Sequence, residues 1–294
     1  MAVQIITDSI ADVTGEDREK LIILPVTIRF DDGSDYKDGE NITHKEFYER
    51  LIESDALPTT SQVTPYMFDE AFKKVVDNGD TAIVITISSK LSGTYQSACI
   101  AADNYKGKII VVDSLSVAVG ERAIVDLAMK YRDEGRSIEE IADILNCEKK
   151  NLQVVAVLDT LEYLKKGGRI SSAVAFAGGV LAIKPVVGVV DGAVVMYGKA
   201  RGSKNAGNAL ISQINACGGI DFTKPYRVGY TGLSDILIKK YIADSSDMWN
   251  KYVDDIEYQT IGCGIGTHVG PGAAAAAFFP KHPERLNNNA KNEN

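Results

Sequence analysis

The chain has 294 residues, of which 45% are hydrophobic and 24% are charged. This balance is typical of a folded globular protein, and the length allows one large α/β domain or two smaller ones. A formal net charge of -8 argues against a nucleic-acid-binding protein, because no domain-wide positive field is present to attract phosphates.

The first residues lack a charged region followed by a long apolar segment, so we expect no secretory signal and a cytoplasmic location. The longest span without Asp, Glu, Lys or Arg, residues 258–280, is interrupted by glycines and Pro271, and we expect no stable membrane insertion. The four cysteines are dispersed without C-x-x-C spacing among only three histidines. The sequence therefore predicts no metal site.

The first half of the chain alternates short apolar runs with helical patterns. Apolar runs at residues 3–7, 81–87, 109–112 and 152–158 each end in polar residues, and a further strand is expected at residues 22–30. Strands that alternate with helices form parallel sheets covered on both faces, and their carboxyl ends meet at one edge. We therefore expect a three-layer parallel-sheet α/β domain over residues 1–158.

Capping residues mark where the helices of this half begin. Thr43 and Glu46 form a capping box before residues 47–52, and Thr64 can cap a helix that begins at Pro65. The hydroxyl-rich segment between these helices, residues 57–65, is expected to be a loop. Further helical patterns cover residues 91–104, 117–132, 138–147 and, after the fourth strand, 161–166.

The second half has a different pattern. Asp191-Gly192 lies between apolar residues 186–190 and 193–197, which predicts a β-hairpin with a type I′ turn. Helices are expected at residues 203–216 and 233–248, and strands at 226–231 and 256–261. We therefore expect a smaller α/β domain with a mixed sheet over residues 159–280, followed by a disordered polar tail at residues 281–294.

Residues 82–97 contain the clearest sign of a binding site. A buried strand leads into Ser92-Gly93-Thr94 at the start of a helix, where hydroxyls and free backbone N–H groups favour an anion. The ordinary alternative is that Ser92 is only a helix cap.

Other candidate donors lie far apart in the sequence, and they are Thr60, Ser61, Arg169, Arg201 and His268. Each has an ordinary alternative, such as a turn, an exposed arginine or a satisfied histidine. The sequence contains no nucleophile elbow, P-loop or H-E-x-x-H motif. Residues 262–272 form a glycine-rich loop around His268, but G-x-G-x-x-G is not met in any register. Donors without a nucleophile–base pair favour binding an anion over transforming one.

The order and spacing of several motifs over residues 3–279 resemble those of the DegV family of fatty-acid-binding proteins. These motifs are Ile6-Thr7-Asp8-Ser9, Thr59-Thr60-Ser61-Gln62, Leu91-Ser92-Gly93-Thr94-Tyr95-Gln96-Ser97, Leu161-Glu162-Tyr163-Leu164-Lys165-Lys166-Gly167-Gly168-Arg169-Ile170, Lys184-Pro185, Arg201-Gly202 and Gly266-Thr267-His268-Val269-Gly270-Pro271-Gly272. One departure is Val63-Thr64-Pro65, where the family commonly has Pro-Ser-Pro.

The resemblance implies two domains with a long-chain fatty acid, such as palmitate, between them. It places the carboxylate at Thr60, Ser92, Arg169 and His268. The remaining residues of the expected site are Ser61, Gly93 and Thr94, with Arg201 nearby or in contact with a kinase. The uncharged segment 173–181 is a candidate wall of the acyl tunnel.

The resemblance further implies a bacterial carrier that is not itself an enzyme and needs no cofactor. Such a carrier presents the acid to a fatty acid kinase, which makes an acyl phosphate for phospholipid synthesis. Two alternatives stay open at this point. One is a dihydroxyacetone-kinase-like subunit that attaches its substrate through a histidine, and the other is a dinucleotide-dependent oxidoreductase that uses residues 262–272.

Overall fold

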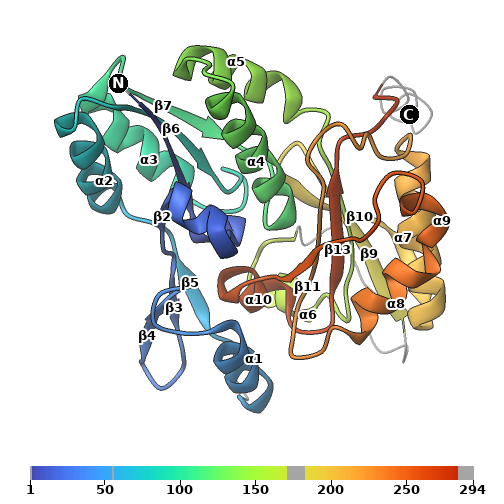
Figure 1. The fold of residues 1–294 in the computed structure, drawn as a ribbon. Helices are drawn as coiled ribbons and strands as arrows, with labels where there is room; N and C mark the ends of the chain where they lie inside the picture. The colour runs from blue at the N-terminus through green and yellow to red at the C-terminus, as the bar shows by residue number, and fades with distance from the viewer. Residues whose placement is uncertain (1, 55, 171–182, 284–294) are drawn as a thin grey trace, which may run out of the picture.

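The computed structural model describes residues 2–54, 56–170 and 183–283. The predicted tunnel segment 173–181 and the tail beyond residue 283 lie outside these residues. The described part of the chain forms three sheets and their covering helices, with a parallel sheet and a mixed sheet on opposite sides of the molecule (Figure 1). None of its helices is both long and apolar enough to cross a bilayer.

The parallel sheet has the strand order β2-β1-β6-β7. Its strands are β1 (Val3–Asp8), β2 (Ile22–Leu24), β6 (Thr81–Thr86) and β7 (Ile109–Asp113). Neighbouring side chains of β1 enter different cores: Ile6 packs with α2 (Pro65–Asp77) and α3 (Thr94–Ala102), and Ile5 packs with α4 (Val119–Asp133) and α5 (Ile138–Glu148). Because successive strand residues point to opposite faces, an unbroken apolar run is covered by helices on both sides. The predicted three-layer arrangement is confirmed.

The mixed sheet has the strand order β10-β9-β8-β13-β11-β12. Its strands are β8 (Gln153–Val157), β9 (Ile183–Val190), β10 (Ala193–Arg201), β11 (Arg227–Tyr230), β12 (Tyr258–Thr260) and β13 (Ala274–Phe278). Strand β8 is antiparallel to both of its neighbours, β9 and β13. The prediction that residues 152–158 form a fourth parallel strand is therefore wrong. A strand buried on both faces is apolar whichever sheet it joins, so its composition does not reveal its partners.

The helices that cover the mixed sheet are α7 (Gly202–Ala216), α8 (Ile236–Asp244) and α9 (Ser246–Trp249), and α6 (Glu162–Lys166) follows β8. The predicted hairpin is confirmed as β9 and β10. Its turn residues Asp191 and Gly192 both have positive φ, 49° and 82°, as a type I′ turn requires.

A third, small sheet joins β3 (Thr27–Arg29), β4 (Asp35–Lys37) and β5 (Thr59–Ser61), next to α1 (His44–Glu53). The predicted strand at residues 22–30 is thus two strands in different sheets, separated at Pro25 and Val26. The predicted loop at residues 57–65 contains β5. Both capping predictions are confirmed: Thr43 and Glu46 form the capping box of α1, and Thr64 Oγ1 accepts a bond from the Met67 N–H.

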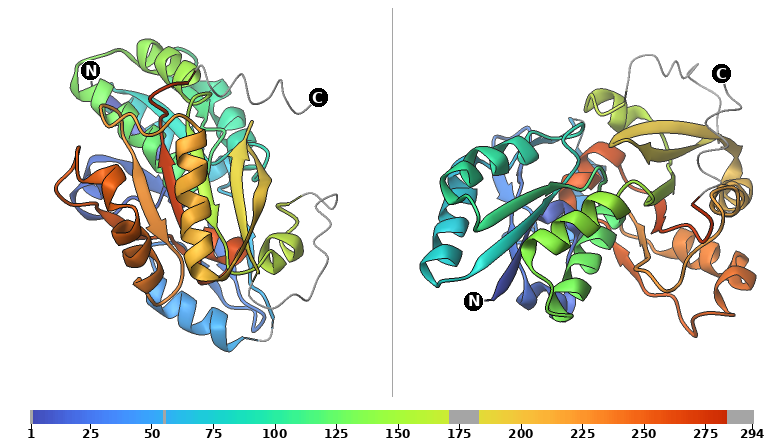
Figure 2. Two further views of the ribbon diagram at one scale, coloured as in Figure 1. Left: turned by 90° about the vertical axis from the view of Figure 1, so that its right-hand side faces the viewer. Right: turned by 90° about the horizontal axis from the view of Figure 1, so that it is seen from above.

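Two helices join the halves of the molecule, which lie side by side when seen from above (Figure 2). Helix α4 packs against β1 and β6 of the parallel sheet and against β11 and β13 of the mixed sheet. Helix α10 (Cys263–Val269) comes from the second half of the chain and packs against α1, β3 and β5 of the first. Short 3₁₀ helices complete the fold at η1 (Ser9–Ala11), η2 (Gly15–Lys20) and η3 (Asp103–Tyr105). The domain boundary at residue 158 stays a prediction, and the position of β8 favours an earlier one.

Candidate functional site

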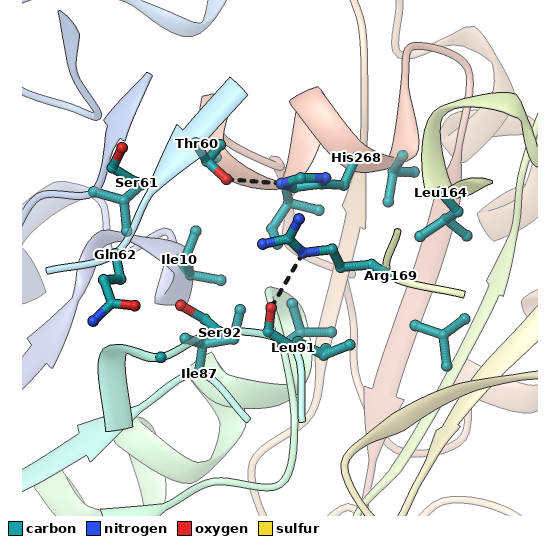
Figure 3. Close-up of a pocket in the computed structure, with 17 residues that line it drawn as sticks. Ile10, Thr60, Ser61, Gln62, Ile87, Leu91, Ser92, Leu164, Arg169 and His268 are labelled. Carbon is teal, nitrogen blue, oxygen red and sulfur yellow. Dashed lines mark hydrogen bonds between the residues drawn. The ribbon is translucent and has the colours of Figure 1, made fainter. Parts of the chain in front are cut away.

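A cavity of about 350 Å³ lies between the two halves of the molecule (Figure 3). Six of the predicted site residues line it, and they are Thr60, Ser61, Ser92, Gly93, Arg169 and His268. They come from β5, the loop before α3, the segment after α6, and α10. The fold therefore brings together residues that are up to 208 positions apart in the sequence.

Thr60 and His268 meet across the boundary between the small sheet and α10. The Thr60 Oγ1 and the His268 Nε2 lie 2.8 Å apart. Burial, with a smaller contribution from the Arg169 charge, lowers the pKa of His268 to about 4. The imidazole is therefore neutral at physiological pH, and only one of its ring nitrogens carries a proton.

Glycine at position 167 gives the imidazole its space. A Cβ atom at Gly167 would lie 2.3 Å from the His268 Nδ1, so any larger residue would displace the ring. This nitrogen has no hydrogen-bond partner among the described residues. The polar contact of His268 is thus concentrated on Nε2 and directed toward Thr60.

Arg169 connects the two halves through backbone oxygens. Its Nη1 donates to the Gly167 carbonyl oxygen at 2.6 Å, and its Nε donates to the Leu91 carbonyl oxygen at 3.3 Å. The side chain is half-buried, and among the described residues no carboxylate forms an ion pair with it. A guanidinium has five N–H groups, so donors remain beyond these two bonds. The cavity therefore holds a positive charge that is not neutralised.

The segment Ser92-Gly93-Thr94 divides into a cavity-lining part and a structural part. Ser92 Oγ lies 3.0 Å from Thr94 Oγ1 and accepts a bond from the Thr94 N–H. Thr94 is fully buried, does not line the cavity, and accepts a bond from the Val63 N–H. Gly93 permits the close approach of Gln62, whose Oε1 would lie 2.1 Å from a Cβ at that position. Thr94 thus supports the loop, while Ser92 lines the cavity.

Two further predicted site residues, Ser61 and Arg201, either do not point toward His268 and Arg169 or lie too far from them. In Figure 3 the Ser61 hydroxyl is turned away from His268 and Arg169, as expected for the residue next to Thr60 on a strand. Arg201 ends β10, whereas Val194, seven residues earlier on this strand, lines the cavity. At strand spacing these two residues are about 20 Å apart. Arg201 is exposed and does not line the cavity.

The deeper part of the site is apolar. A second cavity of about 70 Å³ is lined only by Val, Ala, Leu, Ile and Gly. It shares with the first cavity the residues Val117, Leu164, Val194, Ile265 and Val269. The site therefore has a polar mouth and an apolar extension between the sheets. These lining residues were not predicted from the sequence, because apolar side chains from seven separate helices and strands look like ordinary core.

The predicted glycine-rich loop at residues 262–272 is also wrong, since residues 263–269 form helix α10. Glycine disfavours helix, but here it permits close packing. A Cβ at Gly264 would lie 2.4 Å from the Ile10 Cδ1, and one at Gly266 would lie 2.6 Å from the Phe47 Cε1. The glycines thus serve helix packing in place of a nucleotide-binding loop.

Comparison with known proteins gives a consistent result over nearly the whole chain. Residues 2–281 match the family model described as uncharacterised protein, DegV family. A DegV domain-containing protein of Caldanaerobacter subterraneus subsp. tengcongensis is 37% identical over 285 residues, which cover 95% of this chain and 99% of that protein.

Two solved structures of similar fold are of proteins described as fatty acid binding. A Thermus thermophilus structure described as fatty acid binding of a DegV family protein has a TM-score of 0.84 at 30% identity, covering 95% of this chain and 100% of that chain. DegV of Bacillus subtilis, described as a fatty acid binding protein, has a TM-score of 0.79 at 28% identity, covering 94% and 98%. The family match over residues 2–281, together with these relatives, shows that the chain belongs to the DegV family.

Proposed function

We propose that this protein binds a long-chain fatty acid, with the carboxylate at the polar mouth of the cavity and the acyl chain in its apolar extension. The observation that carries the proposal is the half-buried Arg169, which has no carboxylate partner among the described residues and lies where the lining turns apolar. The descriptions of the Thermus thermophilus and Bacillus subtilis relatives as fatty acid binding support it.

The tautomer of the neutral His268 decides how the hydroxyl of Thr60 is used. An imidazole that donates its Nε2–H to Thr60 Oγ1 leaves the threonine proton free for a carboxylate oxygen. Ser92 offers a second hydroxyl, and Arg169 adds a charge-assisted bond. Bonds to a charged group contribute about 1.5–3 kcal/mol each, which largely offsets the desolvation of the carboxylate.

The acyl chain would supply most of the binding energy. Burial of about 15 methylenes at roughly 0.8 kcal/mol each gives on the order of 12 kcal/mol before the ordering of the chain is subtracted. The head-group residues then determine that the ligand is an acid, and the cavity shape determines which chain fits.

The same site supports a carrier role. We propose that the protein presents the carboxylate to a fatty acid kinase, which forms an acyl phosphate for phospholipid synthesis. Residues next to the head-group site, Ser61 and Gln62, are exposed, so a partner can approach the carboxylate from that side. The exposed Arg201 lies too far along β10 to hold the carboxylate, and any role for it would be contact with the kinase.

The first test identifies the ligand. Denaturing the purified protein and analysing the extract by mass spectrometry should yield a long-chain fatty acid at close to one molecule per chain. A protein that carries no lipid and, after delipidation, binds neither palmitate nor oleate would contradict the proposal.

The second test addresses the head group through Arg169→Ala. We expect this variant to weaken binding of palmitate at least tenfold and binding of methyl palmitate much less, because the ester has no negative charge for the guanidinium. Isothermal titration of both ligands measures the difference. Lys165→Ala removes an exposed cation of α6 and is the matched control. Equal losses for acid and ester would remove Arg169 from the head-group site.

A further inference from the structure

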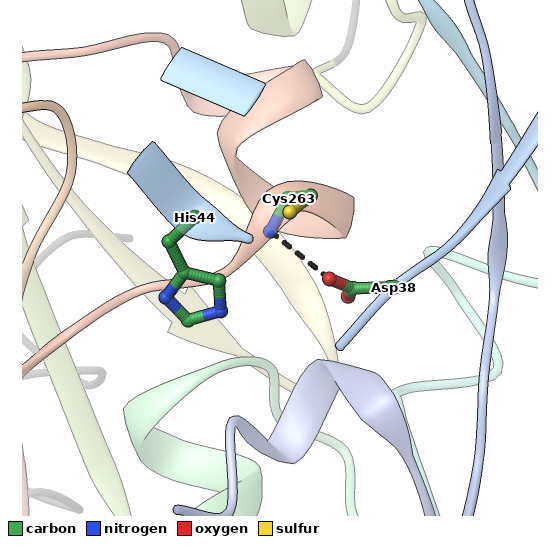
Figure 4. A group of neighbouring side chains, drawn as sticks. All are labelled: Asp38, His44 and Cys263. Atoms are coloured by element: carbon green, nitrogen blue, oxygen red, sulfur yellow. Dashed lines mark hydrogen bonds between the residues drawn. The ribbon is translucent and has the colours of Figure 1, made fainter. Parts of the chain in front are cut away.

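A second cluster of reactive side chains lies at the opposite end of α10 from His268. It consists of Asp38, His44 and Cys263, which come from the segment after β4, the first residue of α1 and the first residue of α10 (Figure 4). One ligand atom from each residue, a carboxylate oxygen, an imidazole nitrogen and the sulfur, lies within 4.8 Å of the other two. The cavity next to this cluster, about 250 Å³, is separate from the fatty-acid site and is lined by Asp38 and His44.

A fourth candidate ligand, Asp12, lines the same cavity. A Cβ at Gly262 would lie 2.3 Å from the Asp12 Oδ1 and 3.0 Å from the His44 Nε2, so these two atoms are at most 5.3 Å apart, the sum of the two distances. Asp12 is only 5% exposed, and its Oδ2 has no hydrogen-bond partner among the described residues. A buried carboxylate oxygen is ordinarily paired, so this atom needs a partner that the described part of the chain does not supply.

We propose that Asp12, Asp38, His44 and Cys263 bind a divalent transition-metal ion of the zinc type. One nitrogen, one sulfur and carboxylate oxygens form a ligand set that Zn²⁺ accepts in four-coordinate sites. The three residues of the cluster are separated in sequence by 6 and 219 positions, which is why no zinc motif is visible in the chain. The ligands are assembled only by the packing of α10 against α1 and the small sheet.

The distances require a modest closure of the cluster around the ion. Zinc–ligand bonds of about 2.0–2.3 Å in tetrahedral geometry put neighbouring ligand atoms roughly 3.3–3.8 Å apart. The three cluster atoms, at up to 4.8 Å, must approach by about 1 Å, and Asp12, which lies outside this 4.8 Å group, must move toward it as well. His44 is half-buried and lines the cavity, which gives an ion a path from solvent.

Backbone and side-chain donors orient Asp38 within this arrangement. Its Oδ2 accepts from the Ser9 hydroxyl at 3.1 Å and from the Gly264 N–H at 3.3 Å, and its Oδ1 accepts from the Cys263 N–H at 3.3 Å. Oδ1 therefore keeps a lone pair for a metal, whereas Oδ2 already accepts two hydrogen bonds. These bonds alone would make Asp38 a cap for α10, so the metal hypothesis depends on the unpartnered Asp12 oxygen and on the nearby sulfur and imidazole.

Electrostatics favours a cation at this position. Asp12 and Asp38 are both buried, at 5% and 2% exposure, and both line the same cavity, so two carboxylates share a site with little access to water. Arg18 also lines the cavity, but its Nη2 donates to the Gly39 carbonyl oxygen. A bound divalent ion would neutralise both carboxylates. It would also fix the end of α10, the helix that carries His268.

The test uses the full-length protein after treatment with a chelator. Titration calorimetry with ZnCl₂ should show one site per chain, and Cys263→Ser and His44→Gln should each weaken it at least tenfold. Cys147→Ser, which removes an exposed thiol of α5, is the matched control and should bind like the parent protein.

Cobalt gives a second, spectroscopic readout that reports directly on the thiolate ligand. Addition of CoCl₂ to the metal-free protein should produce a thiolate-to-cobalt charge-transfer band, absent from Cys263→Ser and retained in Cys147→Ser. No stoichiometric zinc binding, or zinc binding that both site variants retain, would overturn the proposal. Fatty-acid binding is measured separately, so failure of the metal site would leave the proposed function standing.

Discussion

At the scale of single residues, the buried neutral state of His268 makes stability depend on pH. The pKa of His268 falls from 6.5 to about 4 on folding, so the unfolded chain binds a proton in the range where the folded protein does not. Stability is therefore lost as the pH falls from 6.5 toward 4. A shift of this size corresponds to about 3 kcal/mol at the low end of the range.

We expect His268→Gln to lose less stability than the parent protein between pH 6.5 and pH 4. Urea denaturation at a series of pH values measures this, and the difference between the two proteins is the quantity to compare. The two proteins must be compared because Asp8 also titrates in this pH range. Burial raises the pKa of Asp8 to about 7, and protonation of this residue stabilises the folded protein as the pH falls. Parallel curves for the two proteins would show that His268 does not titrate as described.

The sequence identified the polar residues of the site better than the apolar ones. Ser92 and Arg169 stand at the ends of predicted elements next to glycines, which is a local pattern, and both line the cavity. Thr94 has the same local pattern but is turned into the loop toward Val63. Leu164 and Ile265 cannot be distinguished from core by local pattern, because only the meeting of α6 with α10 makes them part of a cavity.

At the scale of elements, the sequence predicted regular alternation and missed strands whose identity depends on their neighbours. The helix caps at Thr43 and Thr64 and the Asp191-Gly192 turn are local features, and all three are confirmed. Strand β5 has exposed, hydroxyl-rich residues that are typical of a loop, and it pairs only because β3 lies beside it. Strand β13 is an alanine run that forms the centre of the mixed sheet. Neither has a local signal that favours a strand.

The hairpin turn also forms a contact between the two halves, and this gives a prediction for Gly192→Ala. Gly192 has a φ of 82°, and a Cβ there would lie 2.4 Å from the Ser88 Oγ. The same Ser88 hydroxyl donates to the Gly192 carbonyl oxygen at 2.8 Å. We expect a loss of about 2 kcal/mol in the free energy of unfolding, because alanine disfavours this φ and displaces Ser88.

Gly198→Ala is the matched control, since Gly198 lies in β10 of the same hairpin and, its chain neighbours apart, no described residue has an atom within 4 Å of a Cβ there. This variant should change the free energy of unfolding by less than about 0.5 kcal/mol. Urea denaturation of both variants provides the comparison. If Gly192→Ala and Gly198→Ala have equal free energies of unfolding, neither the turn geometry nor the Ser88 contact contributes to the joint between the halves.

At the scale of the whole molecule, the two halves are joined by an ion-pair network that is itself largely buried. Arg122 of α4 donates to Asp126 Oδ1 and to Asp17 Oδ2, both at 2.6 Å. Arg227 of β11 donates to Asp126 Oδ2 at 2.5 Å, so Asp126 binds one arginine from each half. The sequence contains all four residues but no pattern that pairs them, because α4 meets β11 only in the folded protein.

Removal of Asp126 should therefore destabilise the joint more than removal of an exposed carboxylate. The Asp126 side chain is 10% exposed and that of Arg122 only 3%, so Asp126→Ala removes one of the two carboxylates that pair with the buried Arg122 and also the carboxylate that pairs with Arg227. We expect a loss of about 3 kcal/mol in the free energy of unfolding. Asp77→Ala breaks the Lys73–Asp77 pair, whose side chains are both more than 60% exposed, and should cost less than about 1 kcal/mol. Because the cavity proposed to bind the fatty acid lies between the halves, Asp126→Ala should also weaken palmitate binding, whereas Asp77→Ala should not. Unchanged stability and unchanged palmitate binding in Asp126→Ala would show that the apolar packing of α4 is enough to hold the two halves together.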